Sequence, residues 1–341
     1  MTAPEPHDGH AHASGVRGVL HGLIVPHRHD SVDSIDDAME ASTAGVRAVK
    51  VGLLALGATA ALQAAVAAAS GSVALLADTV HNVADALTAV PLWVAFVLGR
   101  RTASRRYTYG YGRIEDLAGL FIVAMSALSA GLAGYQAVRR FLEPQPVTNL
   151  GWVVAAGLIG FAGNELVAVY RIRVGRRIGS AALVADGMHA RTDGFTSLAV
   201  VVGATGVWLG FPRSDPVVGL LISLVIAGLL VGTARDIVRR LLDGVDPALV
   251  HRAEQAIRTV PGIVDVEELR MRWLGHRLRV EAAVVTDPAM PVAEFHSLEH
   301  HSDRAVRHVL PHVETVRLSP SSPGHHQLDQ DAGQGADAEC A

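Results

Sequence analysis

The chain has 341 residues, of which 50% are apolar and 18% are charged, and its formal net charge is −4. This small net charge gives no reason to expect a nucleic-acid partner, and a single cysteine, Cys340, excludes a disulfide within the chain and a thiolate metal cluster. The apolar residues concentrate between Val46 and Ala234 in blocks of about 20 residues, long enough to cross a hydrocarbon layer as helices. The sequence therefore predicts a polytopic membrane protein.

The N-terminal segment 1–45 is polar and has no basic stretch followed by an apolar one, so we do not expect a cleaved signal peptide. It is rich in histidine: His7, His10, His12, His21, His27 and His29. Such a tail could capture metal, sense metal, or be an unstructured polar segment of biased composition. We favour weak zinc capture by a cytoplasmic tail.

Six membrane spans are expected within a transmembrane domain over 46–240, at about 47–69, 73–98, 117–138, 151–171, 181–207 and 216–234. Arginine is concentrated in the loops 100–116 and 171–179 and directly after the last span. The loops on the opposite side carry few arginines. By the positive-inside rule, both termini are expected in the cytoplasm of a multi-pass protein of the cell membrane.

The region 241–319 has a different pattern. Helical spacing over 247–260, alternation over 262–273 and 276–287, an amphipathic helix over 292–310 and a last strand over 312–319 give the order α-β-β-α-β. This order predicts a small α+β, ferredoxin-like cytoplasmic domain with its helices on one face of a sheet. Residues 320–341 are rich in Gly, Asp and Gln and are expected to be disordered.

The second and fifth spans contain an internal repeat. The stretch "SVALLADTVHNVADALTAV" begins at Ser72, and "SAALVADGMHARTDGFTSL" begins at Ser180. Eight positions are identical at an offset of 108, among them Asp78/Asp186, His81/His189 and Asp85/Asp193. Because the two copies lie three spans apart, they cross the membrane in opposite directions, which indicates an inverted 3+3 repeat with a substrate site near the membrane midplane.

In each copy the polar residues lie at i, i+3 and i+7, on one helical face. Ionisable groups inside a bilayer are costly and are expected to face protein, water or an ion. His81, Asp85, His189 and Asp193 together would supply two imidazole nitrogens and two carboxylate oxygens, a set that suits tetrahedral Zn²⁺. Without sulfur ligands, Zn²⁺ is favoured and Co²⁺, Cd²⁺ or Ni²⁺ remain open, whereas Cu(I) is disfavoured.

Other interpretations of these residues stay open. The His and Asp side chains could instead form hydrogen bonds or ion pairs between helices. Asp78 and Asp186 could act as gates, could orient the histidines, or could serve as helix-end caps, and we lean towards a structural role. Because a histidine must be neutral to bind metal, loading releases protons, and we expect metal efflux driven by inward proton flow. Zn²⁺ is then transported substrate and not a prosthetic group.

These motifs resemble the cation diffusion facilitator family over about Lys50 to Leu318. The resemblance rests on "SGSVALLADTVHNVAD", "YTYGYGRIEDLAGLF", "ADGMHARTDGFTSLAV", "DPVVGLLISLVI" and "LLDGVDP". It implies a six-helix, proton-coupled exporter of divalent cations that works as a homodimer through its cytoplasmic domains. It also implies that His81, Asp85, His189 and Asp193 form the transport site, and HxxxD on both helices resembles the zinc-handling members.

The resemblance is incomplete in the cytoplasmic domain. A second, dimer-associated metal site in the family uses His and Asp on the strands and the second helix. Here Glu267 stands at the matching strand position, His296 matches the helix position, and His276 lies nearby in the strand turn. The last strand ends without His or Asp, so we regard this regulatory site as doubtful.

Two further functions compete with transport. One is a membrane-embedded sensor that binds zinc without moving it. The other is a zinc-dependent peptidase, because "HSLEH" at 296–300 matches H-x-x-E-H. That pattern specifies only three residues on an amphipathic helix, and a solvated helix face explains it better. We expect a transporter and no enzyme.

Overall fold

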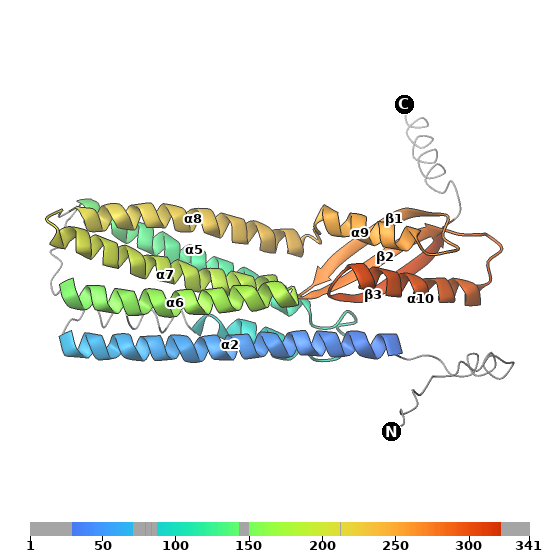
Figure 1. Ribbon diagram of the computed structural model, residues 1–341, viewed down its shortest axis with the longest axis horizontal. Coiled ribbons are helices and arrows are strands. Elements are labelled where there is room, and N and C mark those ends of the chain that lie inside the picture. Colours follow the sequence, from blue (N-terminus) through green and yellow to red (C-terminus); the bar gives the residue numbers. More distant parts are fainter. Residues whose placement is uncertain are drawn as a thin grey trace, which may run out of the picture.

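The computed structural model describes residues 29–70, 79, 83, 87–142, 150–211 and 213–321. Its helices form an elongated bundle that is followed by a smaller α+β domain at one end (Figure 1). The bundle contains α2 (His29–Ser70), α4 (Val90–Gly99), α5 (Arg113–Leu142), α6 (Leu150–Ile178), α7 (Ala181–Trp208) and α8 (Ser214–Leu241). The predicted fold class, a helical membrane domain joined to a small α+β domain, is confirmed.

Four described helices are long and apolar enough to cross a membrane. They match the first, third, fourth and sixth expected spans: Glu40–Ser70, Arg113–Arg139, Leu150–Ile178 and Ser214–Leu241. Helix α7 occupies the fifth span and carries two aspartates, a histidine and an arginine, which lower its mean hydropathy. Of the second expected span, residues 73–78, 80–82 and 84–86 lie outside the described residues, and α4 forms its end.

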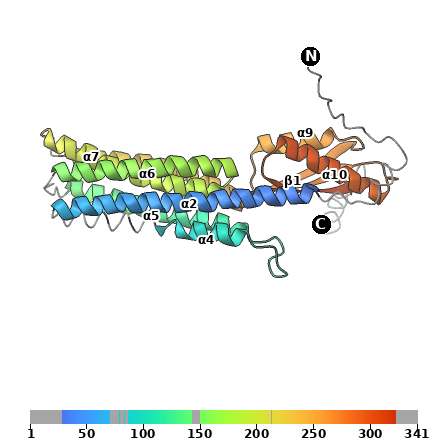
Figure 2. The ribbon, with the colours of Figure 1, turned by 60° about the horizontal axis from the view of Figure 1, so that its bottom comes forward.

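Helix α2 begins at His29, well before the span expected at 47. Hydropathy marks only the part of a helix that suits lipid. The residues upstream of the expected span continue the same helix although their sequence is more polar. The helix therefore extends beyond the hydrocarbon layer towards the C-terminal domain (Figure 2).

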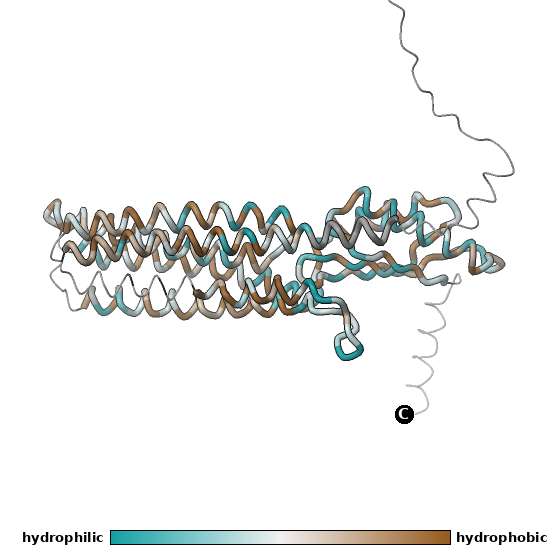
Figure 3. Tube along the Cα trace, turned by 90° about the horizontal axis from the view of Figure 1, so that it is seen from below, coloured by the Kyte–Doolittle hydropathy of each residue, from teal (hydrophilic) through white to brown (hydrophobic). Residues whose placement is uncertain are grey.

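The outer surface of the bundle is apolar, which fits a lipid environment. Leu54, Leu166 and Leu224 lie on three different helices and are each about three-quarters exposed. In Figure 3 the apolar residues follow the bundle, while polar residues dominate the C-terminal domain and the loop between α4 and α5. An apolar surface that extends over several helices in this way is typical of a bundle that faces lipid.

Glycines on α6 allow its neighbours to pack closely. A Cβ at Gly163 would lie 2.1 Å from Thr59 Oγ1 on α2, and a Cβ at Gly160 would lie 2.7 Å from Gln63 Nε2 on α2 and 2.8 Å from Ser197 Oγ on α7. Small residues at helix contacts are the usual means of close packing in membranes, where no hydrophobic effect drives the helices together. Helix α6 is thus held between α2 and α7.

The C-terminal domain has the predicted order of elements. It consists of α9 (Pro247–Arg258), β1 (Asp265–Leu274), β2 (Arg277–Val285), α10 (Val292–Val309) and β3 (Val313–Ser321). The sheet order is β1-β2-β3, with β1 antiparallel and β3 parallel to β2. Helices α9 and α10 contact each other and cover one face of the sheet (Figure 1). The core between these layers includes Ile257, Val280, Leu298, Val306 and Val316.

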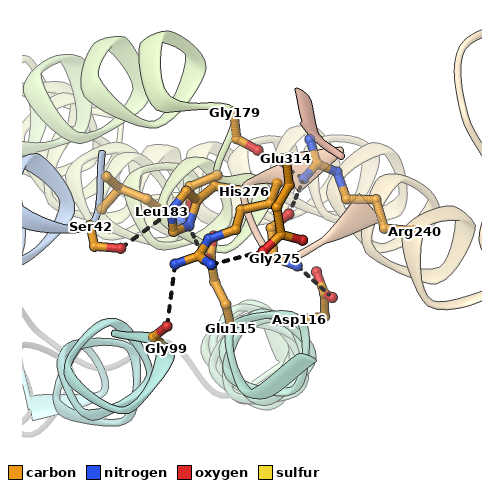
Figure 4. Close-up of polar contacts among 12 residues, drawn as sticks. Ser42, Gly99, Glu115, Asp116, Gly179, Leu183, Arg240, Gly275, His276 and Glu314 are labelled. Carbon is orange, nitrogen blue, oxygen red and sulfur yellow. Dashed lines mark hydrogen bonds and ion pairs between the residues drawn. The ribbon is translucent and has the colours of Figure 1, made fainter. Parts of the chain in front are cut away.

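The turn between β1 and β2 contacts the end of the bundle (Figure 4). Gly275 has a φ of +62° and donates its backbone N–H to Asp116 Oδ2 at 3.2 Å. A Cβ at this position would lie 2.7 Å from Glu115 Oε2 and 2.8 Å from the carbonyl oxygen of Gly112. Glycine is required here both for the left-handed backbone and for the close approach to α5.

His276 is the central side chain of this contact. Its Nδ1 lies 2.7 Å from Glu115 Oε2 on α5, and its Nε2 lies 3.3 Å from Ser42 Oγ on α2. From α8, Arg240 donates to the carbonyl oxygens of Gly179 at 2.8 Å and Gly275 at 3.1 Å. The turn is therefore attached to several bundle helices through buried polar groups.

A second set of charges joins β3 to β2. Arg277 Nη1 lies 3.0 Å from Glu314 Oε1, and Arg279 Nε lies 2.8 Å from Glu314 Oε2. Burial raises the pKa of the Glu314 carboxyl, but the hydrogen bonds and positive charges of Arg279 and Arg277 outweigh burial and hold this pKa below its usual value. Glu314 therefore stabilises the folded chain in its ionised form.

This arrangement predicts a pH-dependent stability. Because the pKa is lower in the folded state, the stabilisation is present above the unfolded pKa of about 4.3 and is lost as the pH falls through the folded pKa. We expect Glu314→Gln to lower the free energy of unfolding of the full-length protein near neutral pH and to have a smaller effect in acid. Denaturant titrations of both proteins at several pH values measure this difference, and a difference that does not change with pH would contradict the prediction.

Candidate metal centre in the helix bundle

The predicted polar face of α7 is formed early in that helix. Gly179 has a φ of +73° and ends α6, and Ser180 Oγ then accepts the Leu183 backbone N–H at 3.1 Å as the N-cap of α7. Glycine commonly follows a helix end because it adopts the left-handed backbone without a steric penalty. Serine commonly precedes a helix start because its side-chain oxygen accepts a backbone N–H that has no partner within the helix. The helix that starts here carries Asp186, His189 and Asp193.

His189 and Asp193 lie one helical turn apart, as their spacing predicts. His189 Nε2 lies 3.9 Å from Asp193 Oδ2, and the two side chains are 3% and 14% exposed. Among the described residues, His189 Nε2 is a buried nitrogen without a hydrogen-bond partner. An imidazole nitrogen and a carboxylate at this separation can become ligands of one cation after small side-chain adjustments.

The other half of the predicted set belongs to the second span. Asp78, His81 and Asp85 lie outside the residues that the structure describes. Within the described part of the chain, no group of three or more His, Cys, Asp or Glu side chains could hold a metal ion. The pairing of the two repeat copies in one site therefore stays a prediction.

Asp186 has a partner that the sequence pattern did not indicate. Its Oδ2 lies 2.9 Å from Arg171 Nη1 on α6, and the two side chains are 1% and 2% exposed. A Cβ at Gly52 on α2 would lie 2.4 Å from Arg171 Nε. The ion pair thus joins α6 to α7 beside α2, which is a structural contact of another kind than the helix-end cap considered from the sequence, because Ser180 caps α7.

The structure also shows polar contacts around the site that sequence reasoning missed. His189 Nδ1 lies 3.0 Å from Ser126 Oγ on α5. Arg191, between the two candidate ligands in sequence, binds Glu165 on α6 through contacts of 2.7 and 3.1 Å. The only sequence signal for Ser126 was a polar residue within an apolar span.

The candidate residues of the C-terminal domain do not come together in the chain. Glu267 lies near the start of β1 and accepts a hydrogen bond from Ser321 Oγ. His276 lies beyond the opposite end of β1, in the contact with α5. About seven residues of extended strand, or roughly 24 Å, separate these ends. His296 is on α10, 67% exposed, with Nδ1 at 3.4 Å from Glu299 Oε2. The structure thus gives His276 an interdomain contact with α5. The regulatory metal site, which we regard as doubtful from the sequence, is not formed among the described residues of one chain.

The H-x-x-E-H motif of α10 is engaged in packing of the domain. Glu299 Oε1 accepts the Leu318 backbone N–H at 3.3 Å and lies 3.7 Å from Arg317 Nη1. The carboxylate of a peptidase of this type must instead activate a metal-bound water. This geometry favours a structural role for Glu299.

Comparison with known proteins supports the interpretation of both domains. Residues 49–242 match the model of the cation efflux transmembrane domain, and residues 245–318 match that of the cation efflux protein cytoplasmic domain.

Several relatives align with most of the chain. A probable cation efflux system protein of Mycobacterium tuberculosis is 55% identical over 328 residues, which cover 96% of this chain and 98% of the relative. The magnetosome protein MamB of Paramagnetospirillum magneticum is 26% identical over 73% of this chain and 84% of its own length. The cation-efflux pump FieF of Serratia proteamaculans is 27% identical over 72% and 83%. This chain therefore belongs to the cation diffusion facilitator family and is a membrane protein of cation efflux.

Proposed function

We propose that this protein exports Zn²⁺ from the cytoplasm in exchange for protons, through a site formed by His81, Asp85, His189 and Asp193. Cd²⁺, Co²⁺ and Ni²⁺ are further candidate substrates because they accept the same nitrogen and oxygen ligands. The family gives cation efflux as the general activity. The choice of zinc comes from the two histidines and two aspartates of the repeat.

The observation that carries this proposal is the buried Nε2 of His189. It has no hydrogen-bond partner among the described residues, and a carboxylate lies 3.9 Å away. A buried polar atom without a partner costs free energy, so its retention needs an explanation such as a transient ligand. A passing metal cation would satisfy it.

Proton exchange follows from the ligand chemistry. Imidazole binds metal only through an unprotonated nitrogen, so protons and metal compete for His81 and His189. A higher proton concentration outside the cell would therefore promote release of metal there, and the lower concentration in the cytoplasm would promote loading. The same competition makes an inward proton gradient the driving force.

The proposal includes the orientation of the protein in the membrane and its oligomeric state. Arginine-rich loops at the end of the bundle that carries the C-terminal domain favour a cytoplasmic position for this end and for both termini. We also propose that the protein works as a homodimer, with the C-terminal domains in contact, as the family resemblance implies.

Flux measurements in proteoliposomes test the proposal. We expect wild-type protein to move Zn²⁺ into a compartment that contains a zinc-sensitive dye, and an opposing proton gradient to accelerate this movement. His189→Ala and Asp193→Asn should reduce the flux to that of protein-free liposomes, and His81→Ala and Asp85→Asn should do the same. Zinc movement that does not respond to the pH gradient would overturn proton exchange.

Two controls separate the alternatives. His296→Ala removes an exposed histidine of α10 and should leave flux unchanged. Glu299→Ala should likewise retain zinc transport, whereas a peptidase would depend on this residue. A sensor would bind zinc at His189 and Asp193 without any wild-type flux, and that result would overturn the proposed transport.

A further inference from the structure

A serine on a neighbouring helix contacts the candidate ligand His189. Ser126 lies on α5, is 5% exposed, and places its Oγ 3.0 Å from His189 Nδ1. The opposite ring nitrogen, Nε2, is the one near Asp193. Ser126 therefore contacts the ring nitrogen on the opposite side from Asp193, where a hydrogen bond can fix the orientation and the tautomer of the ring.

The direction of this hydrogen bond follows from the other contact of the serine. Ser126 Oγ lies 2.9 Å from the carbonyl oxygen of Ile122, one turn earlier on α5. A carbonyl oxygen can only accept, so the single hydroxyl hydrogen of Ser126 is donated to Ile122. The hydroxyl oxygen then offers only lone pairs to His189, and the hydrogen between Ser126 and His189 belongs to Nδ1.

These two hydrogen bonds favour the Nδ1–H tautomer of the neutral His189 ring. With the hydrogen on Nδ1, the lone pair is on Nε2. That nitrogen is the buried atom without a partner, and it faces the Asp193 carboxylate. In the opposite tautomer the hydrogen would be on Nε2, where it would block metal binding. The lone pair of Nδ1 would then face the lone pairs of Ser126 Oγ, and no hydrogen would lie between these two atoms.

We propose that Ser126 is a positioning residue for cation transport, because it holds His189 as the Nδ1–H tautomer and so presents the Nε2 lone pair to the metal. This inference rests on the proposed function of His189 as a ligand. Partners of the second nitrogen of a metal-binding histidine fix its orientation and raise its basicity, and their loss typically lowers metal affinity about 10–100-fold.

Variants at position 126 test the proposal. Ser126→Ala leaves the Nδ1–H of His189 without its acceptor, and we expect the KM for zinc to rise about 10–100-fold, with a smaller change in kcat. Ser126→Thr keeps the hydroxyl group and should restore a KM close to that of the wild type. Ser223→Ala is the matched control, because Ser223 on α8 donates to the Gly219 carbonyl oxygen at 2.8 Å in the same way. Its KM should not change.

The imidazole nitrogen shifts of ¹⁵N-histidine-labelled, metal-free protein give a second readout, with the His189 signals assigned by their loss in His189→Ala. We expect a protonated Nδ1 in the wild type, and a protonated Nε2 would overturn the proposal. If the alanine variant does not fold, Ser126→Cys provides a weaker acceptor of similar size. An unchanged KM in that variant would also overturn it.

His189→Ala distinguishes this inference from the function on which it rests. Loss of transport in His189→Ala with an unchanged KM in Ser126→Ala would overturn the role of Ser126 alone. Normal transport in His189→Ala would overturn the proposed site itself.

Discussion

Asp186→Ala is expected to lower the free energy of unfolding by about 3–5 kcal/mol, because it leaves the buried Arg171 guanidinium without its carboxylate partner. Both side chains are almost fully buried, and their atoms lie 2.9 Å apart. Arg171 Nε and Nη2 have no other hydrogen-bond partner among the described residues. The measurement is unfolding of the purified protein in detergent, by denaturant or heat.

Two further variants make this prediction specific. Asp236→Ala breaks a salt bridge to Arg239 whose side chains are more than half exposed, and such a pair contributes at most about 1 kcal/mol. The double variant Arg171→Met/Asp186→Leu removes both buried charges and should recover most of the lost stability, since apolar replacement of a buried pair is often neutral. If Asp186→Ala were as stable as Asp236→Ala, the structural role of the pair would be wrong.

The contact between His276 and Glu115 gives the second large prediction. The atoms lie 2.7 Å apart and both side chains are buried, so removal of one partner leaves the other unsatisfied. Hydrogen bonds to charged groups contribute about 1.5–3 kcal/mol, and we expect a loss of this size in either His276→Ala or Glu115→Ala. The loss should appear as faster hydrogen exchange in the turn between β1 and β2.

A double-mutant cycle tests whether this contact is direct. The double variant should be less destabilised than the sum of the single variants, with a coupling of at least about 0.5 kcal/mol. Ser42→Ala removes only the longer contact of 3.3 Å to His276 Nε2 and should have a smaller effect. Additive single effects at 115 and 276 would show that the two side chains do not interact.

The periodicity of the sequence predicted the elements and the polar face of α7. Spacing along one helix decides which side chains share a face, so the sequence was sufficient to place His189 and Asp193 together. Alternation and helical spacing likewise predicted the order of strands and helices in the C-terminal domain. The N-terminal limit of α2 was missed because hydropathy reports contact with lipid and not helix formation.

Contacts between elements distant in sequence could not be predicted in this way. The sequence alone determined that this is a helical membrane protein with a small α+β domain and that Asp186, His189 and Asp193 share a helical face. The tertiary structure decided that Asp186 pairs with Arg171, that Ser126 contacts His189, and that His276 joins the C-terminal domain to α5. The physical reason is that periodicity describes one element at a time, whereas each of these partners depends on which helices pack together and at what depth.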